Sequence, residues 1–325
     1  MPTPVRSRVY RGILETLPAP LSARLLQWRL PRQVYIEPTN HCNLQCPLCF
    51  QPDHLRPRGR MTLEQFRALA QELSGFARGL VMHVLGESTL HPDLYSMIAC
   101  AENLGLRCML STNGTLLERQ VDAILESRLS VLRVTIEGSD AATHERYRVG
   151  SDFESVRRGF ERLCAERRRR GLERPWLVVQ TLALGFNTEQ RGEIRAWALA
   201  AGADQHLVRD VHLGLGFAKR PEAELAREFL DEELLRTDPE LSGVDPCKVD
   251  RICSELYRAT ILWNGDVVPC ARGAWNGTGA FGNALRDGGF KRVWRSRAHL
   301  EYLVRHATHG PAGCGTLRTE RAVAP

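Results

Sequence analysis

The stretch Thr39-Asn40-His41-Cys42-Asn43-Leu44-Gln45-Cys46-Pro47-Leu48-Cys49 is the part of the chain from which the fold can be worked out. It places three thiols within eight residues. Directly before it, the apolar run Gln33–Glu37 ends at Pro38, and this pattern predicts a buried strand. The cysteines therefore lie on a loop just beyond the carboxyl end of a strand, which is where a (β/α) barrel builds its active site.

Strand patterns and helix patterns alternate from this first strand to about residue 211. Because a helix separates each pair of strands, the strands run parallel, and the right-handed crossover rule predicts that they curl together. The expected fold is α/β, a partial (β/α)6 TIM-like barrel. The expected strands span residues 33–37, 80–85, 107–110, 131–136, 176–184 and 206–211, and the expected helices span 62–74, 93–104, 116–127, 153–170 and 188–201.

The character of the sequence changes after Gly214–Gly216. From Pro246 onward Cys, Gly and Trp become frequent, and Asn264-Gly265 separates two short apolar runs, which is a strong hairpin signal. A small α+β domain is therefore expected near the carboxyl terminus. The expected divisions are an N-terminal helical extension at 1–31, the barrel at 32–213, a linker helix at 214–245, the small domain at 246–316 and a tail at 317–325.

The composition is that of a folded globular protein, since 43% of the 325 residues are hydrophobic and 25% are charged. The net charge of +6 is thinly spread, and its densest run, Arg167–Arg170, reads as a solvated helix end. No nucleic-acid partner is expected. No apolar stretch approaches the ~18 residues of a membrane span, and the N-terminus has no hydrophobic signal core, so we expect a cytoplasmic protein without a membrane partner.

Ten cysteines in a cytoplasmic chain favour metal binding or catalysis over disulfides, because that compartment keeps thiols reduced. Three thiolates can bind three irons of a four-iron cube, which leaves the fourth iron open. Structural zinc is the alternative, but zinc needs four ligands and His41 adjoins Cys42 too closely to complete a tetrahedron. A separate set, Cys100, Cys108 and Cys164, is expected to pack as buried free thiols.

The spacing Cys42-x3-Cys46-x2-Cys49 after a first strand resembles the radical S-adenosylmethionine (SAM) superfamily. The resemblance implies that these cysteines bind a [4Fe–4S] cluster whose open iron binds SAM. Gly86-Glu87, at the end of the second expected strand, resembles the family's Gly-Gly-Glu motif. Glu87 and the backbone of Gly86 are thereby implied to receive the amino group of the SAM methionine part.

Two later segments also resemble the family. Ser111-Thr112-Asn113-Gly114 is similar to the segment near the ribose and adenine, and Thr135-Ile136-Glu137-Gly138 resembles a Ser-Ile-Asp-Gly segment. Ser111, Asn113 and Thr135 are thereby implied to bind the cofactor. The chain departs from the pattern at Leu85, which replaces the first Gly, and at Leu48, which replaces a common aromatic, so packing on the adenine is expected from Phe50.

The resemblance implies that an electron from the reduced cluster cleaves SAM to a 5′-deoxyadenosyl radical, which takes a hydrogen atom from the substrate. The implied electron donor is a flavodoxin- or ferredoxin-type reductant. His83 and His91 are expected to be structural. Groups that could face the substrate or move its protons lie near the carboxyl ends of the expected strands: Glu37, Glu137, Arg209, Asp210 and His212.

A second cysteine set, Cys247, Cys253, Cys270 and Cys314, lies in the expected small domain. The run Trp263–Cys270 between them resembles the auxiliary-cluster modules called SPASM and, when shortened, twitch. One auxiliary [4Fe–4S] cluster is therefore implied, with Cys247 as its fourth ligand; if Cys247 is free, that iron is open. A four-cysteine zinc site is the alternative, because spacing alone does not separate the two.

An auxiliary cluster can accept an electron from a substrate radical, which indicates a net oxidation, dehydration or decarboxylation. Radical SAM enzymes that modify peptides commonly carry a leader-binding domain, and no segment before Gln33 or after Gly315 is long enough for one. The expected substrate is therefore a small molecule, a sugar, aminocyclitol or nucleoside, in natural-product biosynthesis. The alternatives are a peptide- or protein-modifying maturase and a non-catalytic metal-binding scaffold.

Overall fold

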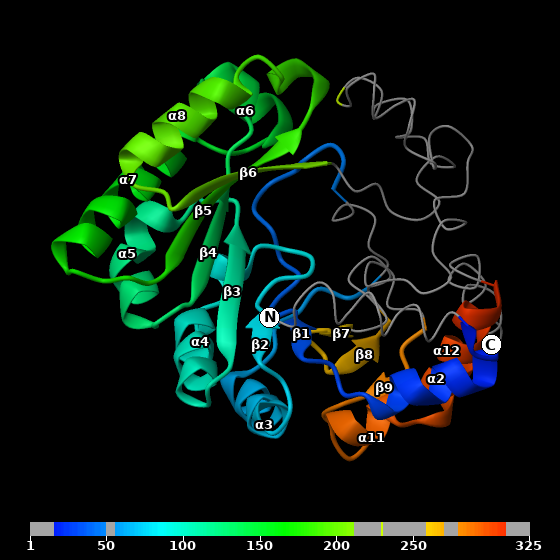
Figure 1. Ribbon diagram of the computed structural model, residues 1–325. Coiled ribbons are helices and arrows are strands. Elements are labelled where there is room, and N and C mark those ends of the chain that lie inside the picture. Colours follow the sequence, from blue (N-terminus) through cyan, green and yellow to red (C-terminus); the bar gives the residue numbers. More distant parts are fainter. Residues whose placement is uncertain (1–15, 50–55, 211–228, 230–257, 270–278, 310–325) are drawn as a thin grey trace.

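The computed structural model describes residues 16–49, 56–210, 229, 258–269 and 279–309 (Figure 1). The strands of these residues form one sheet in the order β6-β5-β4-β3-β2-β1-β7-β8-β9. The strands are β1 Gln33–Ile36, β2 Gly79–Val81, β3 Arg107–Thr112, β4 Val131–Thr135, β5 Trp176–Ala183, β6 Gln205–Asp210, β7 Arg258–Ile261, β8 Asp266–Val268 and β9 Gly282–Asn283.

Helices connect the parallel strands and cover one face of the sheet (Figure 1). The α-helices are α2 Ala19–Trp28, α3 Leu63–Ser74, α4 Leu94–Asn103, α5 Leu117–Glu126, α6 Ala141–Tyr147, α7 Phe153–Arg169, α8 Arg191–Ala201, α11 Phe290–Trp294 and α12 Arg297–His309. Two 3-10 turns are η1 Ser88–Leu90 and η2 Gly185–Asn187. None of the helices in the described ranges is long and apolar enough to cross a membrane.

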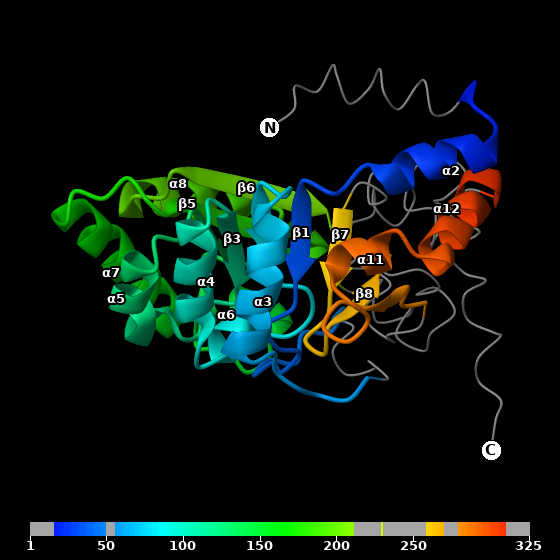
Figure 2. The ribbon, with the colours of Figure 1, turned by 90° about the horizontal axis from the view of Figure 1, so that it is seen from below.

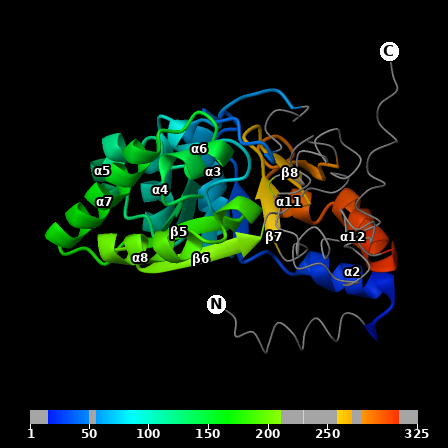
Figure 3. The ribbon, with the colours of Figure 1, turned by 90° about the horizontal axis from the view of Figure 1, so that it is seen from above.

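The first six strands all pair in parallel, each with its neighbour in the chain. This arrangement confirms the predicted partial (β/α)6 barrel. The helix that follows the cysteine loop also begins where the sequence places it, because Thr62 forms a capping box with Gln65. Figure 3 shows the barrel helices and the C-terminal helices α11 and α12 toward opposite ends of the sheet.

One local prediction was wrong, and one element was not predicted. The second strand ends at Val81 instead of residue 85, because the chain turns away from the sheet to place Gly86 at a φ of +82°. The short helix α6 was not expected, although Asp140 caps it by accepting a hydrogen bond from the backbone N–H of Thr143 at 2.8 Å. Both differences lie at the carboxyl edge of the sheet, where the loops meet.

The hairpin at the C-terminal end joins the barrel sheet directly. Strands β7 and β8 are antiparallel around the predicted Asn264-Gly265 turn, where Gly265 has a φ of +91°. On its other side β7 pairs in parallel with β1, so that Tyr35 is in register with Thr260. Helices α2 and α12 lie side by side beyond this hairpin, and the Gln27 side chain donates a hydrogen bond to the Ser296 carbonyl at 2.7 Å (Figure 2).

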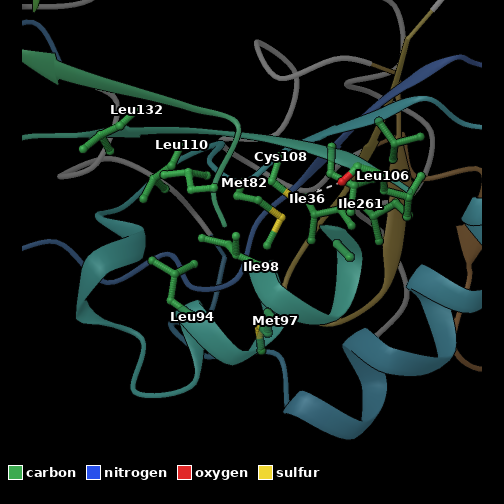
Figure 4. Packing of buried hydrophobic residues seen from close by; sticks show 14 of the residues in the cluster. Ile36, Met82, Leu94, Met97, Ile98, Leu106, Cys108, Leu110, Leu132 and Ile261 are labelled. Atoms are coloured by element: carbon green, nitrogen blue, oxygen red, sulfur yellow. Dashed lines mark hydrogen bonds between the residues drawn. The ribbon is translucent and has the colours of Figure 1, made fainter. Parts of the chain in front are cut away.

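The hydrophobic core lies between the sheet and its helices (Figure 4). Leu110 and Leu132 from the sheet are fully buried, as are Leu94 and Ile98 from α4. Each such side chain contributes roughly 1.5–3 kcal/mol through removal from water. Because strand side chains alternate between faces, the neighbouring residues of β3 and β4 point to the opposite, inner face of the sheet. That inner face and the carboxyl edge are where chemistry can be placed.

Candidate active site

The three clustered cysteines lie on the loop that follows β1. Cys46 is buried, and Cys42 and Cys49 are half-buried. The backbone N–H of Cys49 donates to the Cys46 carbonyl at 3.1 Å, which closes a turn between these two thiols. Apolar side chains from several elements pack around the cysteines: Leu44, Leu48, Tyr147, Leu182, Leu184, Phe186 and Phe229.

The chemistry of these donors fits a cube better than a single ion. A structural zinc ion takes four protein ligands, and this loop supplies three thiols. A [4Fe–4S] cluster instead binds one thiolate on each of three irons. Burial raises the pKa of the Cys42 thiol, and the nearby charges of Glu87 and Cys46 raise it further, so cluster binding must displace its proton.

Gly86 fixes the end of the second βα connection against the cysteine loop. A Cβ atom at this position would lie 2.7 Å from the carbonyl oxygen of His41 and 2.8 Å from the backbone of Asn40, so only glycine fits. Beside it, the backbone N–H of Glu87 donates to the same His41 carbonyl at 2.7 Å. The replacement of the first motif glycine by Leu85 therefore leaves the contact between Glu87 and the loop in place.

The Glu87 carboxylate is buried and accepts four hydrogen bonds. They come from the backbone N–H and hydroxyl of Thr89, the hydroxyl of Thr112 at 2.9 Å and the backbone N–H of Asn113 at 2.7 Å. No cationic side chain of the described residues forms an ion pair with it, so a positively charged ligand group would find an uncompensated charge here. The role predicted for Glu87 toward SAM stays a prediction.

The other predicted cofactor residues gather at the same edge. The side-chain amide of Asn113 donates to the Asn43 side chain in the cysteine loop at 3.0 Å. The Thr135 hydroxyl donates to the Thr112 carbonyl at 3.2 Å, and the backbone N–H of Ser111 donates to the His83 ring at 3.2 Å. Residue Phe50 lies outside the described residues. The ends of β2, β3 and β4 thus meet around the cysteine loop, as the sequence predicts.

Glu137 is linked to the cysteine loop through Arg148, a residue that the sequence pattern did not predict. Glu137 is fully buried and pairs with Arg148, whose Nε lies 3.1 Å from Oε1, while the backbone N–H of Leu182 donates to Oε2 at 2.6 Å. Arg148 in turn donates from Nη1 to the sulfur of Cys46 at 3.6 Å. Burial lowers the pKa of Arg148, but Glu137 and Cys46 raise it by more, so it stays charged. The acid–base role predicted for Glu137 remains untested.

Glu37 forms a second buried pair, with Arg56. The two guanidinium nitrogens lie 2.9 and 2.7 Å from the two carboxylate oxygens, a bidentate contact. The backbone N–H of Trp263 also donates to Glu37 at 3.3 Å, and the Trp263 ring packs directly on Gly59. This carboxylate therefore links β1, the segment after the cysteine loop and the C-terminal hairpin.

Arg209 and Asp210 end β6 and are exposed. Of the remaining site predictions, several lie outside the described residues: His212, Cys247, Cys253, Cys270 and Cys314. The partners Arg148 and Arg56 carried no recognisable signal, since each is one arginine among many in an Arg-rich chain. Only the fold shows which arginine meets which carboxylate.

The chain is similar to several known proteins. The chain is 32% identical to an AdoMet-dependent heme synthase of Oleidesulfovibrio alaskensis over 143 residues, which are 43% of this chain and only 35% of the synthase. It is 27% identical to the PqqA peptide cyclase of Rhodopseudomonas palustris over 294 residues, 82% of this chain and 74% of the cyclase. Streptococcus suis SuiB, solved with its precursor peptide SuiA, shares the fold with a TM-score of 0.65 at 16% identity, over 86% of this chain and 69% of SuiB.

Two family models match the chain. The model of an iron–sulfur cluster-binding domain, SPASM, matches residues 253–315, and that of the radical SAM superfamily matches residues 36–200, about half of the chain. The cofactors of these families are a [4Fe–4S] cluster with SAM, and auxiliary iron–sulfur clusters. The cysteine loop, Glu87 and the strand ends around them lie within the first match. The chain therefore belongs to the radical SAM superfamily.

Proposed function

We propose that this radical SAM enzyme modifies a peptide or a protein. The observation that carries the proposal is the similarity to the PqqA peptide cyclase, which spans 82% of this chain and 74% of that relative. The similarity to the heme synthase covers 43% of this chain. The comparisons thus favour the alternative over the small-molecule substrate that the sequence analysis preferred.

We assign a different role to each group of residues in the site. When bound, the reduced cluster and SAM supply a radical that takes a hydrogen atom from the substrate. The buried Glu87 carboxylate would hold the positive end of SAM, beside Asn113 at the end of β3. Arg148, held by Glu137, keeps a positive charge against the sulfur of Cys46. The apolar side chains around the cysteines exclude water, which would otherwise quench the radical.

The C-terminal region would complete the reaction. We propose that Cys247, Cys253, Cys270 and Cys314 hold one auxiliary cluster, which accepts an electron from the substrate radical while a base takes a proton, so that the peptide loses two hydrogen atoms overall. A flavodoxin- or ferredoxin-type protein would supply electrons to the first cluster. The contact of Glu37 with Arg56 and Trp263 supports the coupling of the two parts, because it joins β1 to the C-terminal hairpin.

The test is turnover of the anaerobically reconstituted enzyme with SAM and reductant. One arm uses short peptides encoded beside the gene, and the other uses deuterated glycosides, with 5′-deoxyadenosine and product masses followed by mass spectrometry. The proposal expects label or mass loss only in the peptide arm. Deuterium transfer from a glycoside to 5′-deoxyadenosine, with every peptide unchanged, would contradict the proposal and favour a small-molecule substrate. Protein that binds no iron or sulfide would instead indicate a scaffold.

A further inference from the structure

The side chain of His144 lies buried behind the segment that carries Arg148. His144 belongs to α6 and is fully buried, and its ring packs against the ring of Phe153 with the centroids 5.3 Å apart. Helix α6 approaches the end of β4 closely because Gly138 has no side chain. A Cβ atom on Gly138 would lie 2.6 Å from the backbone nitrogen of His144. This close approach brings the His144 ring to the backbone of Glu137.

Both ring nitrogens of His144 form hydrogen bonds. The Nδ1 atom accepts from the backbone N–H of Glu137 at 3.2 Å, and Nε2 lies 3.3 Å from the hydroxyl of Ser151. Burial, together with the charge of Arg148, lowers the pKa of His144 to about 3, so the ring is neutral. Because Nδ1 accepts a hydrogen bond, the single ring proton is on Nε2, which donates to Ser151.

The segment 148–151 contacts the cysteine loop at two points. The guanidinium of Arg148 donates from Nη1 to the sulfur of Cys46 at 3.6 Å. The carbonyl of Val149 accepts a hydrogen bond from the backbone N–H of Gln45 at 3.0 Å. A displacement of this segment would therefore change the distance between the guanidinium and the sulfur.

His144 fixes this segment at both ends. Its carbonyl accepts a hydrogen bond from the backbone N–H of Arg148 at 2.9 Å, and its ring binds the hydroxyl of Ser151. The same ring binds the backbone of Glu137, whose carboxylate pairs with Arg148. His144 thus fixes the position of Arg148 through the backbone on one side and through the ion pair on the other.

Glu137 is also held from the side of β5. Its Oε2 atom accepts from the backbone N–H of Leu182 at 2.6 Å, and its carbonyl accepts from the side-chain amide of Asn187 at 2.9 Å. These contacts remain when His144 is replaced. A substitution of His144 is therefore expected to displace Arg148 while Glu137 stays at the end of β4.

We propose that His144 is a positioning residue, which holds the Glu137–Arg148 pair against Cys46 and thereby raises the reduction potential of the cluster bound at the cysteine loop. A positive charge and a hydrogen bond at a cluster sulfur both favour the reduced cluster. The effect of the charge falls as its distance from the cluster grows. This role rests on the one proposed above for Arg148 and is independent of the substrate.

The test is a redox titration of the anaerobically reconstituted holoprotein, followed on the electron paramagnetic resonance signal that SAM perturbs. His144→Leu removes both ring nitrogens and should shift the potential in the negative direction, by no more than Arg148→Met does. His144→Asn keeps an acceptor for the backbone N–H of Glu137 and should restore part of the potential. In the Arg148→Met background, His144→Leu should add no further shift, because both changes act through the same guanidinium.

The matched control is His299→Leu, which also replaces a buried neutral histidine, here in α12. Both leucine variants should lower the melting temperature, but only His144→Leu should shift the potential. Ser151→Ala is a milder variant that removes the partner of Nε2, and it decides the question if His144→Leu does not fold. It should shift the potential in the same direction as His144→Leu.

Three results would overturn the proposal: an unchanged potential in His144→Leu and Ser151→Ala, an equal shift in His299→Leu, or a further shift when His144→Leu is added to Arg148→Met. If Arg148→Met shifts the potential and His144→Leu does not, only the role of His144 fails. An unchanged potential in both variants refutes the role of Arg148 as well. Failure of every peptide to react would contradict the proposed substrate and leave the role of His144 standing.

Discussion

The guanidinium of Arg148 donates a hydrogen bond to the sulfur of Cys46, with Nη1 3.6 Å from Sγ. Glu137 fixes the position of this guanidinium, because Glu137 is fully buried and forms an ion pair with it. Glu37 and Arg56 form a second buried pair at the end of β1, in which Nη1 and Nη2 of Arg56 donate to the two carboxylate oxygens of Glu37 at 2.9 and 2.7 Å. The chain thus carries a matched pair of Glu–Arg contacts, one of which reaches a predicted cluster ligand.

Arg148→Met should make the cluster harder to reduce. The variant removes a positive charge and a hydrogen bond to sulfur, both of which favour the reduced cluster. A charged hydrogen bond of ordinary strength corresponds to a shift of roughly 60 to 130 mV toward negative potential. An anaerobic redox titration, followed on the electron paramagnetic resonance signal that SAM perturbs, measures it. Arg56→Met is the control, and equal shifts in both variants would contradict the role of the sulfur contact.

Replacing Cys42, Cys46 and Cys49 together by Ala should remove about four irons per chain and abolish 5′-deoxyadenosine formation. Iron in the auxiliary site should remain, so that the loss is partial. Cys164→Ala is the control, because this buried thiol packs in the core and should affect stability while leaving the iron content unchanged. Iron and sulfide analysis after reconstitution decides the outcome. An unchanged iron content in the triple variant would refute the assignment.

Gly86→Ala should impair SAM binding, whereas Gly105→Ala should not. Both glycines have a positive φ, of +82° and +78°, so both substitutions cost about 1 kcal/mol or more in backbone strain. Only the Cβ at position 86 collides with the cysteine loop, 2.7 Å from the His41 carbonyl, and the Cβ at position 105 meets nothing within 4 Å. Equilibrium dialysis of labelled SAM and thermal melts separate the two effects. Equal SAM affinities in the two variants would contradict this prediction, because they would mean that the cysteine loop moves aside for the added Cβ without loss of SAM binding.

Stability should fall as the pH drops from 7 to 5, in part through His299. Burial lowers the pKa of this residue to about 4 in the folded protein, against an ordinary value of 6.5. The unfolded chain therefore gains a proton in this window while the folded chain does not, and acid favours unfolding. The contribution is about 2 kcal/mol. Urea unfolding of the cluster-free protein at both pH values should show a smaller loss for His299→Gln than for the wild type; identical losses would exclude the residue.

The backbone plan was accessible from the sequence because its signals are local. Thr62 and Gln65 predict the start of helix α3, and Asn264-Gly265 predicts the turn of the β7–β8 hairpin. In both cases the signal lies within a few residues of the element that it predicts. The pairing of β7 with β1 was not accessible, since more than 200 residues separate Tyr35 from Thr260 and no short pattern encodes their register.

The same distinction between local signals and long-range contacts applies to the candidate site. The cysteine loop and Glu87 follow spacing rules, and the structure brings them together through the His41 carbonyl. The identity of the buried ion-pair partners does not follow such rules. Glu137 was expected to face the substrate, but its partner is fixed by the loop after α6, a helix that the sequence pattern did not reveal.

The pairing of β7 with β1 has a consequence for anyone who would divide the protein. β1 is flanked by β2 on one side and β7 on the other, and the backbone N–H of Glu37 donates to the Ile261 carbonyl at 2.9 Å. A chain cut at residue 213 would strip one edge of the strand that leads into the cysteine loop. An exposed edge of this kind recruits strands from other molecules. We therefore expect the separated N-terminal part, with the cysteine loop, to aggregate. The N-terminal and C-terminal parts should be produced as one chain.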